Sequence, residues 1–361
     1  MKLLTSRELA RAANLDIPGG VVIAKALMQI FRYNKLNRVY TNTYDNDPAV
    51  FINSILDHLD IRYDIPDKDL ENIPLTGPFI TVSNHPFGGI DALILLKILA
   101  RRRSDVRVMA NFLLQKIDPL KHLIVPADAE GESHEGMTSR KGMEEAMSHV
   151  REGHGLALFP AGEVSTYQSE SGLIADMEWQ EQILREVRMA EVPVIPVYFH
   201  GTNSRWYHIL GRIHPLLSTA KLGSELFNKR HKIIRVRIGR SLSVSEQAGF
   251  GDIARFGRYL RARTYSLGSS LEAKPFFSGF MPRRNRRQEP VAPPSDRATL
   301  AAEINNIRRT YQLFTVSNFV VLFAPTRAIP NLIREIGRMR EVTFRAVGVG
   351  PIRATALLEC Y

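Results

Sequence analysis

Short apolar runs alternate with helical patterns through the middle of the chain, and this alternation constrains the fold more than any other feature. The apolar runs include "FITVS" at 79–83, "VRVMA" at 106–110 and "KIIRVRIG" at 232–239, and segments such as "KGMEEAMSHVREG" separate them. Most of these runs lack polar alternation, which is typical of strands buried on both faces in parallel sheets covered by helices. The sequence therefore predicts an α/β fold with a mostly parallel central sheet flanked by helices.

The segments on either side divide the chain into four predicted regions. Residues 1–75 have mostly helical patterns, and residues 76–275 hold the α/β domain. Proline and arginine crowd residues 276–300 without apolar periodicity, which indicates a linker. Residues 301–361 contain a strand-like run at 314–324 and then one amphipathic helix. Because such a βα fragment cannot bury its own apolar faces, we expect it to be the truncated start of a second domain.

An apolar stripe in the N-terminal region indicates an amphipathic helix. Its members recur at helical spacing and are Val22, Ile23, Ala26, Leu27, Ile30 and Phe31. We interpret the stripe as the core-packing face of a helix, and an interfacial membrane helix is the alternative. The chain has no apolar run of about 18 residues and no signal-peptide pattern at its N-terminus. We therefore expect any contact with a membrane to be peripheral.

The charge of the chain narrows the classes of partner. A formal net charge of +11 favours nucleic acid, acidic lipid surfaces or phosphorylated substrates. Arginines cluster at 101–103 and 283–287, which keeps a nucleic-acid-binding protein as an alternative, but no basic strand interleaved with aromatic residues supports it. Cys360 is the only cysteine, so an internal disulfide and a cysteine-based metal site are excluded. We predict no metal site.

A histidine and an aspartate flank a glycine-rich turn in "NHPFGGID" at 84–91. A predicted strand ends directly before this segment, and the apolar helix "DALILLKIL" follows it. Taken alone, His85 fits a turn histidine and Asp91 fits a helix N-cap. The turn can also fold the carboxylate onto the imidazole, where it would fix the tautomer and raise the basicity of the other ring nitrogen. His85 would then be a general base for a hydroxyl or an amine.

Two further loops follow predicted strands and carry polar residues. In "FPAGEVS" at 159–165 a small-residue turn ends an apolar strand, at the edge where α/β sheets place ligands and where backbone N–H groups can hold a phosphate. An ordinary loop is the alternative. The run "VPVIPVYFHG" at 192–201 contains two prolines, so we expect an edge strand or a bulge. His200, Thr202 and Asn203 follow at its end, either as site residues or as the polar exit of a structural strand.

The order and spacing of these three segments resemble the glycerolipid (lysophosphatidate-type) acyltransferase superfamily. The resemblance covers about residues 40–270 and is strongest to the branch of hemolysin-like proteins and lyso-ornithine or lyso-glycine lipid O-acyltransferases. The strand with Pro196 resembles the fourth motif of the family, which has a structural or acyl-pocket role. Further on, "IREIGRMREVTFRAVGVG" resembles the start of the acetyltransferase-like N-acyltransferase domain of ornithine and glycine lipid synthesis.

The resemblance implies roles for particular residues. His85 would be the catalytic base and Asp91 its orienting partner, with five residues between them where the commonest family form has four. The residues implied to contact substrates are Asn84, Gly88, Gly89, Asn111, Gly162, Glu163 and Ser165. The third motif usually has a glutamate before its glycine and an arginine after it, whereas this chain has Ala161 and Val164. Without that arginine, a phosphatidate-type acceptor is disfavoured and an aminoacyl lipid acceptor fits.

The activity that the resemblance implies is transfer of a fatty acyl chain to the hydroxyl of a lyso-lipid. The donor would be acyl carrier protein or acyl-CoA, and no metal or redox cofactor is implied. The expected partners are the membrane lipid acceptor, the thioester donor and an anionic membrane surface, with no nucleic acid. We expect the protein to lie peripherally on the cytoplasmic face of the inner membrane. A membrane-perturbing hemolysin is the alternative within the same branch, and no spanning segment supports it.

Overall fold

The protein is described by a computed structural model that divides into two compact units. One unit comprises residues 1–167 and 174–271, and the other comprises residues 168–173 and 272–361. The residues that the structure describes are 5–7, 10, 19–110, 114, 117–127, 139–168, 173–213, 215–270, 291–316 and 319–346. The predicted linker at 276–300 lies outside the described residues up to residue 290, as does the chain beyond residue 346.

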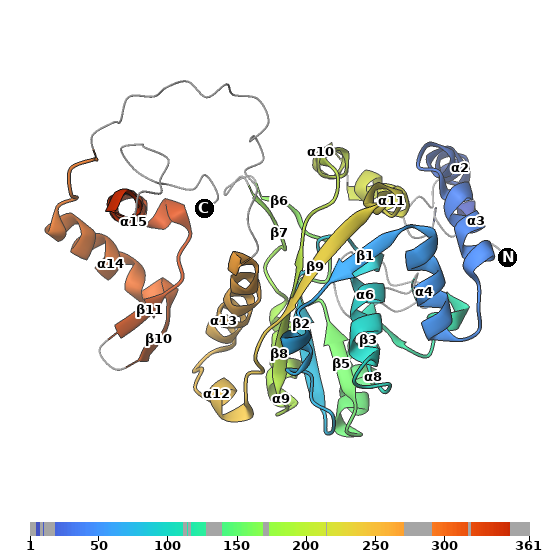
Figure 1. Cartoon of the computed structure of the whole chain (residues 1–361), viewed down its shortest axis with the longest axis horizontal. Coiled ribbons are helices and arrows are strands. Elements are labelled where there is room, and N and C mark those ends of the chain that lie inside the picture. Colours follow the sequence, from blue (N-terminus) through green and yellow to red (C-terminus); the bar gives the residue numbers. More distant parts are fainter. Residues whose placement is uncertain are drawn as a thin grey trace. The chain divides into compact units, whose positions relative to one another are not determined.

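A seven-stranded sheet forms the centre of the first unit (Figure 1). In spatial order its strands are β1 (Ile61–Asp64), β9 (Lys232–Ile238), β8 (Val194–His200), β2 (Phe79–Ser83), β5 (Gly155–Leu158), β3 (Arg107–Ala110) and β4 (Ile124–Pro126). The five strands from β8 to β4 run parallel to one another. Strand β9 is antiparallel to β8, and β1 is parallel to β9. The prediction of a mostly parallel central sheet flanked by helices is therefore confirmed.

Helices cover both faces of this sheet and bury two separate sets of apolar side chains. Strand β2 contributes to both, because Phe79 belongs to one core and Ile80 and Val82 to the other. The first core includes helices α4 (Pro48–His58) and α6 (Gly89–Ala100). The second core includes helices α8 (Arg140–Arg151), α9 (Glu181–Met189) and α13 (Ile253–Ser266). Burial on both faces explains why the strand sequences lack polar alternation.

The N-terminal region contains a strand as well as the expected helices. Helices α2 (Gly20–Ile30), α3 (Tyr33–Thr43) and α4 precede β1, and the short α5 (Asp67–Leu70) follows it. Strand β1 pairs with β9. In this pair Ile61 lies opposite Lys232, which is 171 positions further along the chain. The region expected to be mostly helical thus also supplies the edge strand of the central sheet.

The apolar stripe at α2 faces a core only in part, since Leu27 and Phe31 pack, partly buried, against a small apolar cluster while other members are exposed. The buried residues of α2 are Gly20, Ala24 and Met28, a set of small and flexible side chains. Val22 and Ile30 from the predicted stripe are 71% and 68% exposed. The helix therefore packs through its neighbouring face and leaves large apolar side chains at the surface. Within the described part of the chain, no helix is long and apolar enough to cross a bilayer.

Strand β8 lies inside the sheet, so of the two predicted alternatives the edge strand was wrong and the irregularity within a strand remains. It pairs with β2 on one side and β9 on the other. The ladder with β9 begins at Val197, after the proline, and Val194 makes a separate bridge to Leu242. Pro196 lies between these two contacts and accepts a hydrogen bond from the backbone N–H of Gly239 through its carbonyl. A proline fits an internal strand here because the ladder is interrupted at its nitrogen.

The first unit also contains several shorter elements that lie between the strands and helices already named. They are η1 (Asp118–Leu120), α10 (Arg205–Ile213), α11 (Pro215–Glu225), η2 (Phe227–Lys229), α12 (Val244–Ala248) and η3 (Leu267–Ser270). Strands β6 (Thr166–Gln168) and β7 (Leu173–Ala175) form a separate two-stranded sheet, of which residues 168 and 173 are assigned to the other unit. Helices α10 and α11 follow the end of β8, at the upper edge of the sheet in Figure 1. Helices α10 and α11 therefore lie at the carboxyl ends of the parallel strands.

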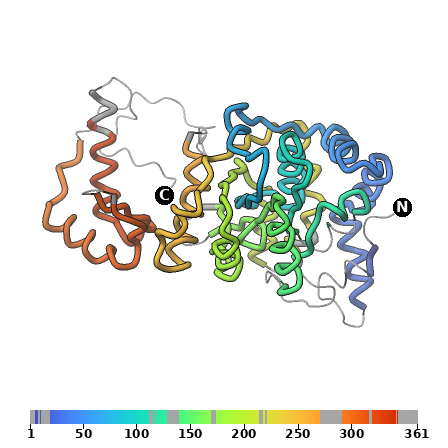
Figure 2. Tube along the Cα trace, turned by 90° about the horizontal axis from the view of Figure 1, so that it is seen from below, coloured from blue at the N-terminus to red at the C-terminus, as the bar shows by residue number. Residues whose placement is uncertain are grey.

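The second unit contains α14 (Arg297–Tyr311), β10 (Gln312–Val316), β11 (Phe319–Leu322), η4 (Thr326–Ala328) and α15 (Pro330–Ala346). Figure 2 follows their Cα trace in orange to red. The strand expected over 314–324 is divided into β10 and β11, which pair as an antiparallel hairpin. Glu303 of α14 accepts hydrogen bonds from the backbone N–H groups of Asn331 and Leu332 at the start of α15. That contact satisfies donors that a helix start leaves without intrahelical partners.

Candidate active site

The segment from His85 to Asp91 forms a tight turn between the end of β2 and the start of α6. Asp91 is the third residue of α6, and its carboxylate folds back over the turn. Its Oδ2 accepts hydrogen bonds from the backbone N–H groups of Phe87 (2.9 Å) and Gly88 (3.0 Å). The N-cap residue is therefore Gly88 and not Asp91 as predicted, and Asp91 holds the backbone of the turn from the third position of the helix.

The same carboxylate oxygen also meets the imidazole of His85. Nδ1 of His85 lies 3.0 Å from Oδ2 of Asp91, whose side chain is 0% exposed. The His85 side chain retains 16% exposure. Because Nδ1 faces the carboxylate, Nε2 is the ring nitrogen left for a substrate. One carboxylate oxygen thus holds the backbone of the turn and also faces the imidazole.

Burial dominates the electrostatics of Asp91. Complete removal from water raises the pKa of its carboxyl, while His85 and the two backbone N–H groups act in the opposite direction. Among the described residues, Oδ1 of Asp91 has no hydrogen-bond partner. The interactions of the carboxylate are therefore concentrated on Oδ2, the oxygen that faces the imidazole.

Glycine is required at one position of the turn. Gly88 has φ of +86°, a backbone conformation that other residues adopt only with strain. A Cβ there would lie 2.6 Å from Cδ2 of Leu222 in α11 and 3.4 Å from Cγ2 of Val164. At Gly89 a Cβ would make only an ordinary contact, 3.6 Å from Leu114. Gly88 therefore lets the five-residue spacing close over Asp91 beneath tightly packed neighbours.

The loop after β5 packs directly against the turn from His85 to Asp91. The ring of Phe159 stacks on the His85 imidazole with centroids 4.1 Å apart. The backbone N–H of Ser165 donates to the carbonyl of His85 at 2.9 Å. Gly162 and Glu163 lie at the exposed tip of this loop, and Gly162 has φ of +75°. The structure thus brings the first and third predicted motifs together at the ends of β2 and β5.

Asp176 joins these two loops, and no sequence motif pointed to it. Its Oδ1 accepts from the Ser165 hydroxyl at 2.5 Å and from the backbone N–H of His85 at 3.1 Å. Its Oδ2 accepts from the indole N–H of Trp179 at 3.1 Å. The residue is 1% exposed. Asp176 therefore holds the backbone of His85 against the third motif, and Ser165 uses its hydroxyl inside the protein.

Asn84 connects the turn from His85 to Asp91 to β8. Its Nδ2 donates to the carbonyl of Phe199 at 2.9 Å, and its Oδ1 accepts from the N–H of the same residue at 2.7 Å. Asn84 is 3% exposed. Thr202, one of the polar residues after β8, contacts Nε2 of His208 through its hydroxyl at 2.9 Å. Asn111 lies outside the described residues. The implied substrate contacts of these residues stay predictions.

Three side chains of the kinds that bind metal ions lie just before β5, at the end of the sheet opposite to the His85–Asp91 turn. His149, Glu152 and His154 each offer one ligand atom, and these atoms lie within 4.8 Å of one another. Both histidines already use a ring nitrogen on Asp105, with His149 at its carbonyl and His154 at its carboxylate. This group shares no residue with the His85–Asp91 pair.

The chain matches the family model described as Acyltransferase over residues 7–274. It is similar to a lyso-glycine lipid O-acyltransferase of Bacteroides thetaiotaomicron, 27% identical over 68% of this chain and 89% of the relative. A second protein of that name, from Phocaeicola vulgatus, is 29% identical over 61% of this chain and 78% of its own length. Among solved structures, the chain is similar to a 1-acyl-sn-glycerophosphate acyltransferase of Thermotoga maritima, with 15% identity, a TM-score of 0.40 and coverage of 74% of this chain and 96% of that chain. Because the family model covers well over half of the sequence, the chain belongs to the acyltransferase family.

Proposed function

We propose that this acyltransferase moves a fatty acyl chain from the thioester of acyl carrier protein or CoA to the hydroxyl of a lyso-lipid. Membership of the acyltransferase family and the names of the two relatives support the reaction class and the lipid acceptor. The observation that carries the mechanism is the approach of His85 Nδ1 to the buried Asp91 carboxylate at 3.0 Å. In this arrangement His85 is the general base and Asp91 orients it.

The proposed reaction is one acyl transfer. Nε2 of His85 takes the proton of the acceptor hydroxyl as the oxygen attacks the thioester carbonyl. The new C–O bond forms, the C–S bond breaks, and the proton passes from the imidazolium to the leaving thiolate. The N–H groups of Phe87 and Gly88 are already bonded to Asp91. We therefore assign the oxyanion to the N–H groups of Gly89 and Ile90, the next free donors of the helix start.

The acceptor that we propose is an aminoacyl lyso-lipid such as a lyso-glycine or lyso-ornithine lipid. Where related enzymes carry an arginine in the third motif, this chain has Val164, which packs near Gly88. An apolar side chain there offers no charge to a phosphate headgroup. The name of the two bacterial relatives agrees with such an acceptor.

A peripheral position on an anionic membrane, on the cytoplasmic face of the inner membrane, completes the proposal. The net charge of +11 attracts the protein to acidic lipids and to the acidic acyl carrier protein. Val22 and Ile30 of α2 are exposed apolar side chains that could enter the lipid interface.

A substrate panel tests the proposal. The purified full chain is incubated with acyl carrier protein or CoA thioesters and with lyso-glycine lipid, lyso-ornithine lipid or lysophosphatidate, and products are identified by mass spectrometry. We expect an ester-linked chain on an aminoacyl lyso-lipid and a much slower reaction with lysophosphatidate. Acylation of lysophosphatidate alone would overturn the acceptor assignment, and absence of transfer to all three lipids from either donor would overturn the activity.

A further inference from the structure

Helix α10 carries a row of large apolar side chains on its exposed side. Trp206, Ile209 and Ile213 are 67%, 46% and 68% exposed. Their spacing of three and four residues places them on one helical face. Tyr207 and His208, on the opposite side of the helix, are buried. The helix is therefore apolar toward solvent as well as toward the protein. We call Trp206, Ile209 and Ile213 the α10 ridge.

The surroundings of the α10 ridge match a lipid interface. Two arginines, Arg205 and Arg212, flank the ridge on the same helix. The guanidinium of Arg212 lies 5.5 Å from the ring of Tyr167, which is itself 38% exposed. Tryptophan and tyrosine beside basic residues are typical of helices that lie in the headgroup region of a bilayer. The excess of positive charge over the whole chain adds attraction to acidic lipids.

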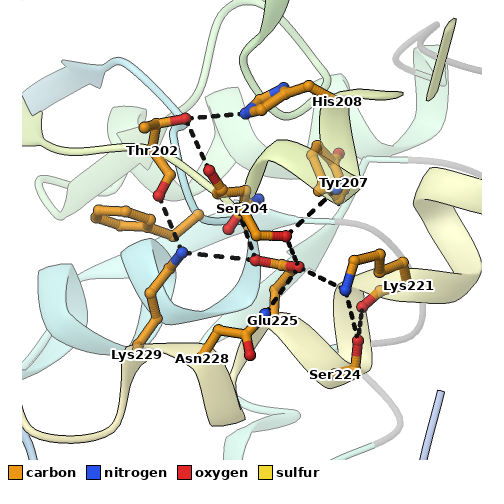
Figure 3. Close-up of polar contacts among 12 residues, drawn as sticks. Thr202, Ser204, Tyr207, His208, Lys221, Ser224, Glu225, Asn228 and Lys229 are labelled. Atoms are coloured by element: carbon orange, nitrogen blue, oxygen red, sulfur yellow. Dashed lines mark hydrogen bonds and ion pairs between the residues drawn. The ribbon is translucent and has the colours of Figure 1, made fainter. Parts of the chain in front are cut away.

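A buried ionic cluster fixes the start of α10 (Figure 3). Glu225, at the end of α11, is 1% exposed and accepts from both the backbone N–H and the hydroxyl of Ser204, at 2.9 and 2.6 Å. The ammonium of Lys221 lies 2.9 Å from its carboxylate, and that of Lys229 lies 3.7 Å away. Burial acts to raise the pKa of Glu225, but Ser204 and Lys221 outweigh it and lower the pKa to about 2. A buried charge with these partners holds one helix geometry.

The same cluster joins α10 and α11 to the catalytic turn. Lys229 donates to the carbonyl of Thr202 at 3.0 Å, and its ammonium lies 4.8 Å from the centre of the Phe87 ring. Leu222 of α11 occupies the space directly beside Gly88. The α10 ridge is therefore carried by a helix pair that packs against the residues between His85 and Asp91.

Helix α11 also connects this region to the N-terminal helices. The ring of Tyr33 in α3 packs so closely on Gly223 that a Cβ there would lie 2.8 Å from its Cζ. Helix α3 directly follows α2, whose Val22 and Ile30 are exposed. Two helices with exposed apolar side chains are thus linked through α3 and α11 at the edge of the sheet where β8 ends.

We propose that the α10 ridge inserts into the interface of an anionic bilayer and brings the catalytic turn to the membrane-embedded acceptor. This inference rests on the proposed lipid acceptor and deepens it by naming a surface through which the enzyme meets the lipid phase. The acceptor then reaches His85 from the bilayer beside α10 and α11. The ridge acts on delivery of substrate, since none of its residues contacts His85 or Asp91 in the described structure.

The test compares the full chain with the double variant Trp206→Gln, Ile213→Gln on vesicles of phosphatidylglycerol and phosphatidylethanolamine. Co-sedimentation is expected to show about tenfold weaker partition of the variant. Acyl transfer is measured with a long-chain lyso-glycine lipid in the vesicles and with a water-soluble short-chain analogue. The ratio of the vesicle rate to the soluble rate is expected to fall about tenfold. Met189→Gln is the matched control, because Met189 is 74% exposed at the end of α9, before β8 begins.

Several outcomes would overturn the inference. Unchanged vesicle partition of the double variant would do so, as would an equal fall of both rates, which would place the ridge in the reaction itself. Loss of a dimer in analytical ultracentrifugation with unchanged vesicle binding would assign the ridge to a second copy of the chain. If the parent protein is inactive on both substrates while the double variant still loses vesicle binding, the proposed function fails and the lipid surface stands.

Discussion

Two aspartate–histidine pairs in this protein share one nitrogen–oxygen distance but differ in geometry and surroundings, because Nδ1 of His154 makes a hydrogen bond and Nδ1 of His85 lies in an ion-pair contact without hydrogen-bond geometry. In both, Nδ1 of the histidine lies 3.0 Å from Oδ2 of the aspartate, for His85 with Asp91 and for His154 with Asp105. The first pair lies where β2 ends, at the edge where α/β sheets bind ligands. The second pair lies just before β5 begins, at the end of the sheet where the parallel strands start. The distance alone therefore does not distinguish a catalytic pair from a structural one.

The other partners of each carboxylate make the difference. Asp105 accepts two hydrogen bonds from the guanidinium of Arg103, at 2.8 and 2.7 Å, and is 28% exposed. Those bonds hold the pKa of Asp105 down at about 2. Asp91 has no arginine partner in the described structure and is wholly buried, which raises its pKa. An arginine already compensates the charge of Asp105, whereas the carboxylate of Asp91 is directed at an imidazole in a water-poor turn.

Replacing each carboxylate by an amide is expected to give the largest difference in kcat between the two pairs. Asp91→Asn removes the charge that orients His85, so we expect kcat for acyl transfer to fall at least about 100-fold. Asp105→Asn is the matched control and should leave kcat within about twofold while lowering the melting temperature, because Arg103 loses its carboxylate partner and keeps only backbone carbonyls. Steady-state kinetics and thermal unfolding measure both variants. Equal losses of kcat would show that the two pairs do not differ as we infer.

A smaller effect is expected from the glycines beside the two pairs. Gly88 and Gly153 both have positive φ, +86° and +95°. A Cβ would collide with Leu222 at Gly88, whereas nothing lies within 4 Å at Gly153. Gly88→Ala is expected to lower kcat about tenfold and to destabilise the fold by about 1–3 kcal/mol. Gly153→Ala should cost only about 1 kcal/mol and leave kcat unchanged. A Gly88→Ala variant with full activity would contradict the packing described for the turn.

The smallest effect concerns the pH dependence of stability. The pKa of Asp105 falls from its ordinary 3.8 to about 2 in the folded protein. A carboxyl group whose pKa is lowered by folding stabilises the folded protein at any pH above its pKa in the unfolded chain. This contribution is lost as the pH falls from about 4 to 2. Urea unfolding at pH 5 should show Asp105→Asn less stable than the parent by on the order of 1 kcal/mol, after allowance for solvent screening. The difference should shrink toward pH 2. A difference independent of pH would exclude this origin.

The parts of the site that are local in sequence could be predicted, and the parts built from distant residues could not. His85, Asp91 and the glycines between them lie within one turn, so their spacing along the chain is enough to indicate the pair. Asp176 escaped prediction because it reaches His85 across 91 positions of sequence. No local pattern marks an aspartate whose partners are a backbone N–H, a serine and an indole.

In the fold, too, some elements could be predicted from the sequence and others could not. The buried strands of the parallel sheet were evident from their apolar runs, because burial on both faces removes polar alternation. Strand β1 is short and carries Arg62 and Asp64, so its pairing with β9 left little trace in the sequence. The apolar stripe of α2 is buried only in part, because an exposed apolar side and a core-facing side of a helix have the same periodicity. Which side the protein buries depends on the helices packed beside it.

The measurement that tests the central claim most directly is acyl transfer to a lyso-lipid by His85→Ala compared with His154→Ala. Each variant removes the histidine of one of the two pairs, and circular dichroism verifies that both remain folded. Our account predicts that His85→Ala abolishes ester formation, since no other base among the described residues adjoins Asp91, and that His154→Ala retains nearly the full rate. Retained activity in folded His85→Ala, or equal loss in both variants, would contradict the assignment of His85 as the catalytic base.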